Sequence, residues 1–199
     1  MKEFINKVQN IRDKIANINS VLDNLCVKNL YALPNIIRCL SFNSKNKVSA
    51  FLTGTLTSLD ESDFVGVTSI KAQQFKDLTS LQSVSLPVEI NNISTEAFIN
   101  CINLSQVILP RELRDISTGV FENCTSLTSI ELPESMILIN ERAFSGCSNL
   151  TDIYLNSHSC RIAGTSAIPL TTVIHVPIGS GESYRSHAVW SLYTIVEDL

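Results

Sequence analysis

A repeat with a period of 23 residues runs through the middle of the chain and limits what it can fold into. Four phenylalanines and four leucines share this spacing: Phe75, Phe98, Phe121 and Phe144, and Leu81, Leu104, Leu127 and Leu150. Isoleucines keep the same step at Ile70, Ile93, Ile116 and Ile139. A unit this short cannot bury its own apolar face, so copies must stack and share one continuous core.

Each unit reads roughly I-x-x-x-x-F-x-x-C-x-x-L-x-x-I-x-L-P. Its end alternates apolar and polar residues, which is the period of a β-strand, and proline closes three units where no ladder donor is needed. The segments STEAFINCINLSQVILP, STGVFENCTSLTSIELP and NERAFSGCSNLTDIYLN resemble the BspA-type leucine-rich repeats. The resemblance covers about residues 67–199 and implies a repeat solenoid of parallel β coils.

The chain divides into four parts on this pattern. We predict a helical attachment or oligomerisation module at 1–43, transition strands at 44–66, leucine-rich repeats at 67–177 and a C-terminal cap at 178–199. The last part looks like the terminal segment common in this family, with Tyr184 and then Trp190 on a helix. Such a segment would cover the open end of the core and block edge pairing.

The N-terminal module carries an a/d heptad pattern over about three heptads. Its apolar positions are Phe4, Val8, Ile11, Ile15, Ile18, Leu22 and Leu25. Isoleucine at both a and d favours a trimer, so these residues are candidates for self-association. The alternative is an amphipathic hairpin that packs on the first coil as an N-terminal cap.

Composition limits the partners. The formal net charge is −4 and no basic run is present, which argues against nucleic acid and against an anionic membrane surface. No stretch approaches the roughly 18 apolar residues of a membrane span. The N-terminus also lacks the apolar segment of a secretory signal, so we expect a protein that needs no export signal.

Catalytic and metal-binding patterns are missing from the sequence, and we expect no enzyme activity, metal or cofactor. No phosphate-binding loop, nucleophile elbow or zinc-binding helix motif occurs. His187 lies one helical turn from Ser183, but surface residues of a capping helix explain the pair better than a nucleophile and base. The acidic group Asp60, Glu61 and Asp63 could bind calcium, although a solvated loop is the simpler interpretation.

Three of the six cysteines, Cys101, Cys124 and Cys147, follow the 23-residue period. Stacked coils would hold them about 4.8 Å apart, where they would act as small buried hydrophobic side chains. The family resemblance implies the same structural role. We therefore predict free, buried thiols, which suits a protein that matures in a reducing compartment.

The residues between the inward apolar positions of each strand must point outward. They form two columns along the predicted sheet, from which seven residues are the candidate ligand-binding set: Gln106, Ile108, Ser129, Glu131, Asp152, Tyr154 and His175. A tyrosine among polar groups suits contact with a glycan or a protein. The alternative is an ordinary solvated sheet face.

Several functions agree with these features. The first hypothesis is a bacteriophage virion structural or host-attachment protein, in a fibre, tail or capsid, since residues 5–24, followed by residues 30–40, resemble the leading helical module of phage tail and fibre proteins. It would be made in the host cytoplasm and would contact other virion proteins and a host glycan or protein. The alternatives are a BspA-like adhesin on a bacterial or protist cell surface, an intracellular scaffold, and a glycan depolymerase that uses Glu131 and Asp152.

Overall fold

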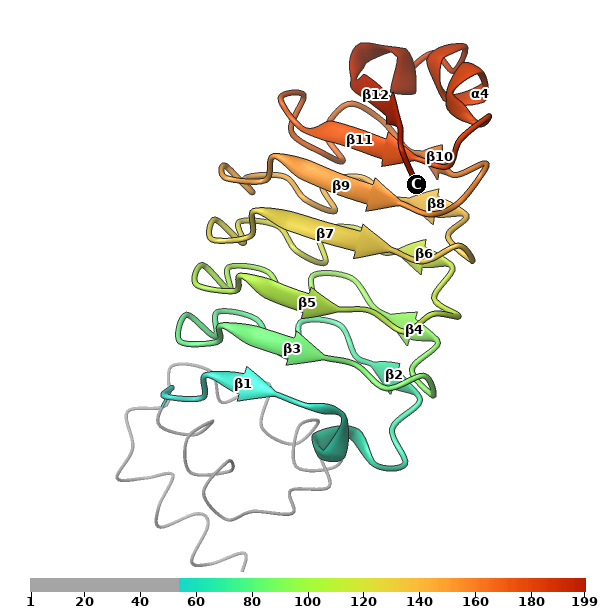
Figure 1. The fold of residues 1–199 in the computed structure, drawn as a ribbon. Helices are drawn as coiled ribbons and strands as arrows, with labels where there is room; N and C mark the ends of the chain where they lie inside the picture. The colour runs from blue at the N-terminus through green and yellow to red at the C-terminus, as the bar shows by residue number, and fades with distance from the viewer. Residues whose placement is uncertain (1–53) are drawn as a thin grey trace, which may run out of the picture.

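A computed structural model describes residues 54–199. The predicted helical module, its heptad residues and the first ten residues of the transition segment lie outside the described residues. The described chain winds into a solenoid in which each coil adds one strand to a main sheet and one short strand to a second sheet (Figure 1).

All pairing in the described solenoid is parallel. The main-sheet strands are β1 (Ser58–Leu59), β3 (Ser83–Ser85), β5 (Gln106–Ile108), β7 (Ser129–Leu132), β9 (Asp152–Leu155) and β11 (Val173–Val176). The second-sheet strands are β2 (Ser69–Ile70), β4 (Asn92–Ile93), β6 (Asp115–Ile116), β8 (Leu138–Ile139) and β10 (Arg161–Ile162). Equivalent repeat positions face each other, as in Val84 opposite Val107 and Ile130 opposite Ile153, so the structure confirms the parallel solenoid.

The segment expected to be a transition already contains the main-sheet strand of a coil. Ser58 of β1 lies opposite Ser83 of β3, in the same kind of register as the later strands. A short 3-10 helix, η1 (Glu61–Phe64), follows β1, and Asp60 caps it by accepting a hydrogen bond from the Ser62 backbone N–H. The acidic residues of this segment therefore begin a helical turn.

Stacked phenylalanines form the centre of the core. The ring centroids of Phe75, Phe98, Phe121 and Phe144 are separated in turn by 5.1, 5.7 and 5.5 Å, with the rings nearly parallel. All four side chains are fully buried, together with the leucine and isoleucine columns. The repeat period thus translates directly into one column of contacts along the solenoid axis.

Neither sheet is continuous in the described chain. The main sheet consists of β1, β3 and β5 on one side of a break and β7, β9 and β11 on the other. The second sheet is interrupted one coil earlier, between β4 and β6. The gap between β5 and β7 is visible in Figure 1, and nothing in the repeat pattern predicts it.

The C-terminal cap differs in part from the prediction. Two short helices, α4 (Gly181–Arg185) and η2 (Trp190–Leu192), bury Tyr184 and Trp190 over the last coil, as expected. The chain then continues as β12 (Thr194–Glu197), which pairs in parallel with β11 and so extends the main sheet. The cap thus occupies the free edge of β11 with a strand of its own, which the prediction did not include.

The outer edge of β12 is instead covered by α4. The Asp198 backbone N–H bonds to the Val176 carbonyl, so the Ile195 carbonyl, three residues earlier, faces away from β11. Arg185 donates to this carbonyl at 3.3 Å and to the Glu197 carboxylate at 2.9 Å. A charged side chain on an edge strand is a common protection against further pairing. Within residues 54–199, no helix has the length and apolar character needed to cross a membrane.

Candidate functional site

The predicted outward columns do lie on the surface of the main sheet. Five of the seven candidate residues are exposed, namely Gln106, Ile108, Ser129, Glu131 and Tyr154. Asp152 and His175 are partly buried because they contact other side chains. The outward orientation is therefore confirmed, whereas a binding role for these residues stays a prediction.

His175 is held between two carboxylates. Its Nε2 lies 3.0 Å from Asp152 Oδ1, and its Nδ1 lies 2.9 Å from Asp198 Oδ2. Both ring nitrogens can donate only when the imidazole is protonated. Burial lowers the pKa of His175, but the hydrogen bonds and charges of Asp152 and Asp198 outweigh it and raise the pKa above 6.5. The ring thus joins Asp152 of β9 to Asp198 near the C-terminus.

This arrangement predicts a pH-dependent stability. A group whose pKa is raised by folding gives stability that is fully present below the unfolded pKa and lost as the pH rises through the folded pKa. The ordinary pKa of histidine, which serves as the unfolded value, is 6.5. We therefore expect the free energy of unfolding to fall as the pH is raised from below this value to well above it. Denaturant titrations at both ends of this range measure the change.

His175→Gln should flatten that dependence, since no titrating ring remains between the two carboxylates. His158→Gln is the matched control, because His158 is exposed in the segment between β9 and β10. Equal pH profiles for the wild-type protein and His175→Gln would contradict the assignment.

Tyr154 stacks on the fixed imidazole. The two ring centroids are 4.5 Å apart with an angle of 23° between the planes, and the Tyr154 side chain stays 37% exposed. On its other side, Tyr154 lies opposite Glu131 of β7. An exposed aromatic ring that is already oriented can contact a ligand with little loss of conformational entropy.

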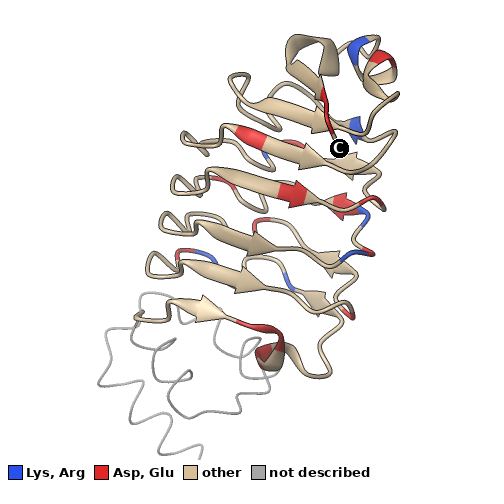
Figure 2. Ribbon diagram, in the orientation of Figure 1, with Lys and Arg blue, Asp and Glu red and all other residues tan. Residues whose placement is uncertain are grey.

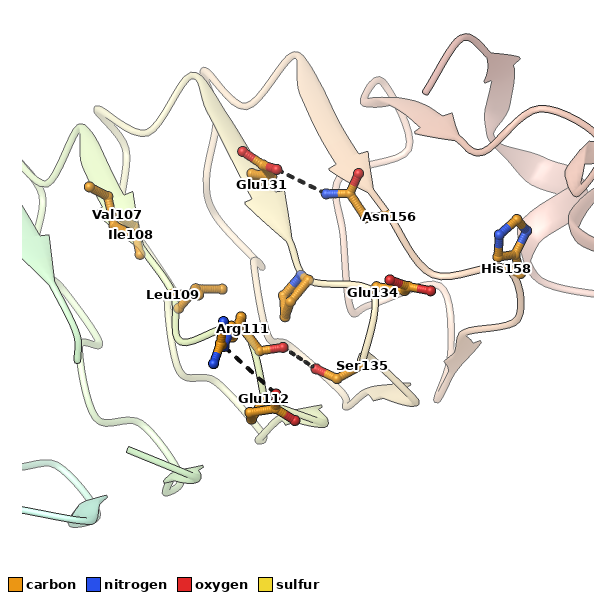
Figure 3. A pocket seen from close by; sticks show the side chains of 11 residues that line it. Val107, Ile108, Leu109, Arg111, Glu112, Glu131, Glu134, Ser135, Asn156 and His158 are labelled. Atoms are coloured by element: carbon orange, nitrogen blue, oxygen red, sulfur yellow. Dashed lines mark hydrogen bonds and ion pairs between the residues drawn. The ribbon is translucent and has the colours of Figure 1, made fainter. Parts of the chain in front are cut away.

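A groove of about 960 Å³ opens beside Glu131, where the main strands turn toward the second sheet (Figure 3). Its apolar part comes from Val107, Ile108, Leu109 and Pro133. Its polar part comes from Arg111, Glu112, Glu131, Glu134, Ser135, Asn156 and His158. Glu131 and Ile108 belong both to the groove and to the predicted sheet-face set, so the two surfaces are continuous.

Few polar contacts order the groove. Asn156 Nδ2 donates to Glu131 Oε1 at 3.0 Å, and Ser135 Oγ donates to the Arg111 carbonyl at 2.8 Å. The second contact joins two successive coils at the turn. Of the groove lining, only Ile108 and Glu131 belong to the strand positions predicted to point outward. Most of the other lining residues follow the strands and lie outside the period of two, so strand alternation could not predict them.

Acidic residues outnumber lysine and arginine on the main sheet. Glu131 and Asp152 lie on its outward face, and none of the described main-sheet strands contains lysine or arginine. Glu197 of β12 lies opposite the buried Val176 and pairs with Arg185. Figure 2 shows the same distribution, with acidic positions on β7 and β9 and no basic position on a main strand. This face favours neutral or cationic ligands over polyanions.

The three periodic cysteines are buried and free, as predicted. Their thiols donate to carbonyls of the preceding coils, with Sγ of Cys101 3.2 Å from the Phe75 oxygen and Sγ of Cys147 3.0 Å from the Phe121 oxygen. Burial raises the pKa of Cys101 and of Cys147 to about 12. Neutral thiols of this kind are poor nucleophiles and poor metal ligands.

Two other sequence candidates have structural roles. His187 Nδ1 accepts the Val189 backbone N–H at 3.2 Å, so this nitrogen is not directed at Ser183 as a base. Among residues 54–199, no group of three histidine, cysteine or acidic side chains is arranged to hold a metal ion. Asp60 and Asp63, which could have bound calcium, form the capping box of η1.

Parallel coils of this length, with an inward leucine, isoleucine and phenylalanine in each, define a leucine-rich-repeat solenoid. The family model described as "BspA type Leucine rich repeat region (6 copies)" matches residues 47–168, which is more than half of the chain. The chain therefore belongs to the BspA-type leucine-rich-repeat family. No curated protein sequence matches it.

Three solved structures are similar to this chain. A leucine rich repeat protein of T. pallidum has 26% identity and a TM-score of 0.58, covering 74% of this chain and 72% of that one. The pneumococcal vaccine antigen PcpA has 16% identity and a TM-score of 0.53, covering 71% and 41%. A leucine rich cell surface protein of Faecalibacterium prausnitzii has 26% identity and a TM-score of 0.49, covering 70% and 31%. The chain thus spans less than half the length of two of these proteins.

Proposed function

We propose that this chain is a non-enzymatic binding module of a BspA-like surface protein, and that its partner contacts the main sheet around Tyr154. The observation that carries the proposal is the exposed Tyr154 ring, held against His175 at 4.5 Å. Membership in the family supports surface display, since the resemblance implies proteins that bind host components. The virion hypothesis receives no support from the family match or the similar structures, and the N-terminal residues that suggested it lie outside the described range.

Several features of the site suit binding. Tyr154 offers a rigid, amphipathic surface, and the partly buried Asp152 and His175 hold polar atoms beside it in fixed positions. Aromatic anchors of this kind account for a large share of the binding energy at many interfaces. The absence of lysine and arginine from the described main-sheet strands favours a neutral glycan or a protein surface with positive charge.

The carboxylates of this face fit a depolymerase less well. Glycoside hydrolysis needs one carboxylic acid whose pKa is raised so that it can protonate the leaving group. Hydrogen bonds from Thr151 and then from His175 lower the pKa of Asp152 instead. No other observation favours cleavage, so the proposal stays with binding.

The experiment is a binding screen with a matched pair of variants. Purified protein is titrated onto arrays of glycans and of extracellular-matrix proteins, and each positive partner is measured again with Tyr154→Ala. Loss of an aromatic anchor costs about 2 kcal/mol, so the Kd should rise roughly thirtyfold. Val88→Ala, at a residue that is 45% exposed on the turn after β3, should leave the Kd unchanged. A partner that binds Tyr154→Ala as tightly as the wild-type protein would place the binding surface elsewhere.

A further inference from the structure

The break between β5 and β7 exposes part of the solenoid core. Val107 and Leu109 occupy the inward columns, yet they are only partly buried. The equivalent side chains of β7, Ile130 and Leu132, are buried. Since no strand pairing joins β5 to β7 in the described chain, the core at this level opens into the groove.

The same break leaves strand edges without a partner. The Leu86 N–H donates to the Ile108 carbonyl, so the backbone N–H and C=O of Ile108 are directed toward β3. In a parallel ladder, the flanking residues Val107 and Leu109 then direct their backbone groups toward β7. Such groups at the rim of a groove are available to hydrogen bond an extended peptide backbone.

Negative charge surrounds this opening (Figure 3). Glu112, Glu131 and Glu134 line the groove against a single arginine, Arg111, whose Nε lies 3.8 Å from a Glu112 oxygen. Asn156 donates a hydrogen bond to one carboxylate oxygen of Glu131. Within the described residues, Glu134 makes no hydrogen bond or ion pair, so its charge is not compensated by the protein.

We propose that this groove is a docking site for an extended, basic peptide segment of a protein partner. An apolar side chain of the segment lies against Val107, Ile108 and Leu109, and a neighbouring lysine or arginine faces Glu131 and Glu134. The groove of about 960 Å³ has room for several residues. The inference rests on the proposed function, because it assigns a partner class to a surface that is continuous with the Tyr154 face.

The experiment uses the full chain labelled with ¹⁵N and three synthetic peptides. One peptide alternates lysine and leucine, the second has glutamate in place of lysine, and the third has serine in place of leucine. The lysine–leucine peptide should shift the amide signals of residues 107–109, 131–132 and 134–135, and the glutamate peptide should not. The serine peptide should bind roughly tenfold more weakly, because it buries no apolar side chain.

A charge-neutral variant tests the acidic wall. Glu131→Gln combined with Glu134→Gln should weaken the lysine–leucine peptide roughly tenfold and reduce the salt dependence of its binding. Glu89→Gln is the matched control, since Glu89 is an exposed acidic residue on the equivalent turn after β3 and does not line the groove. It should leave peptide binding unchanged.

The proposal is overturned if the lysine–leucine peptide leaves residues 107–109 unshifted, or if the glutamate peptide binds equally well. A neutral glycan that shifts these residues while the peptides do not would also overturn it. If no peptide binds but an array partner binds in a way that depends on Tyr154, the proposal for the groove is refuted and the proposal for the Tyr154 face is kept. The opposite result, peptide binding at the groove with no partner that depends on Tyr154, would refute the Tyr154 face and keep the groove.

Discussion

Replacing Phe121 by alanine should lower the free energy of unfolding by about 3–5 kcal/mol, the usual cost of truncating a buried aromatic residue. Phe121 is fully buried, with the rings of Phe98 and Phe144 stacked 5.7 and 5.5 Å away. Truncation therefore removes two ring contacts and leaves a cavity between successive coils, and a close-packed core closes such a cavity only in part. Denaturant titration followed by far-UV circular dichroism measures the loss.

Ile108→Ala provides the comparison for this variant. Ile108 lies on the neighbouring coil but is 62% exposed, so its truncation should change the free energy of unfolding by less than about 0.5 kcal/mol. If Phe121→Ala were as mild as Ile108→Ala, the stacked phenylalanines could not be the centre of the core. The stability of a repeat protein depends on contacts between neighbouring units, so the interior position of Phe121 should make the effect large.

The solenoid could be predicted from the sequence because its core is strictly periodic. A residue that recurs every 23 positions must occupy the same place in each coil, and the observed pairs, such as Val84 opposite Val107, follow directly. The pattern also fixes which side of each strand is exposed, which placed Glu131 and Tyr154 on the surface correctly. It does not fix the distance between successive coils, so the break between β5 and β7 left no sign in the pattern.

The sequence contains a signal for the His175 cluster that the strand analysis did not use. Asp152, His175 and Asp198 are each separated by 23 residues, but this spacing is not the register in which the strands pair here. Residues that face each other on neighbouring strands are closer in sequence here than 23 residues, with Val173 opposite Asp152. The imidazole therefore reaches Asp152 diagonally, which is a side-chain contact that an analysis of facing pairs overlooks.

A second overlooked signal marks the corners of the coils. Asp77, Asn100, Asn123 and Gly146 share the period, and all have positive φ, between 60° and 75°. Asparagine, aspartate and glycine are the residues that tolerate this conformation most readily. Asn123 Nδ2 donates to Asn100 Oδ1 at 2.8 Å, and Asn100 Nδ2 donates to Asp77 Oδ1 at 2.7 Å. The column therefore joins neighbouring coils through side chains as well as through the backbone.

Trp190→Ala should be comparably damaging, at about 3–5 kcal/mol, because this side chain closes the C-terminal end of the core. Trp190 is 1% exposed, and its rings make edge contacts with Tyr184 and Tyr193 at centroid distances of 5.6 Å. Its Nε1–H also donates to the Cys160 carbonyl at 2.8 Å, so the variant leaves a buried carbonyl without its donor.

Trp190→Phe separates these two contributions, since it keeps most of the apolar surface but loses the donor. It should fall between the wild-type protein and Trp190→Ala in far-UV denaturation curves. Leu192→Ala, on the same 3-10 helix but 56% exposed, should have little effect. Because α4 and η2 cover the last coil and Arg185 covers the edge of β12, loss of the tryptophan should also speed amide exchange in β11 and β12. Slow exchange in these strands despite Trp190→Ala would mean that the parallel pairing of β12 with β11, and not the aromatic cluster, holds the end of the solenoid closed.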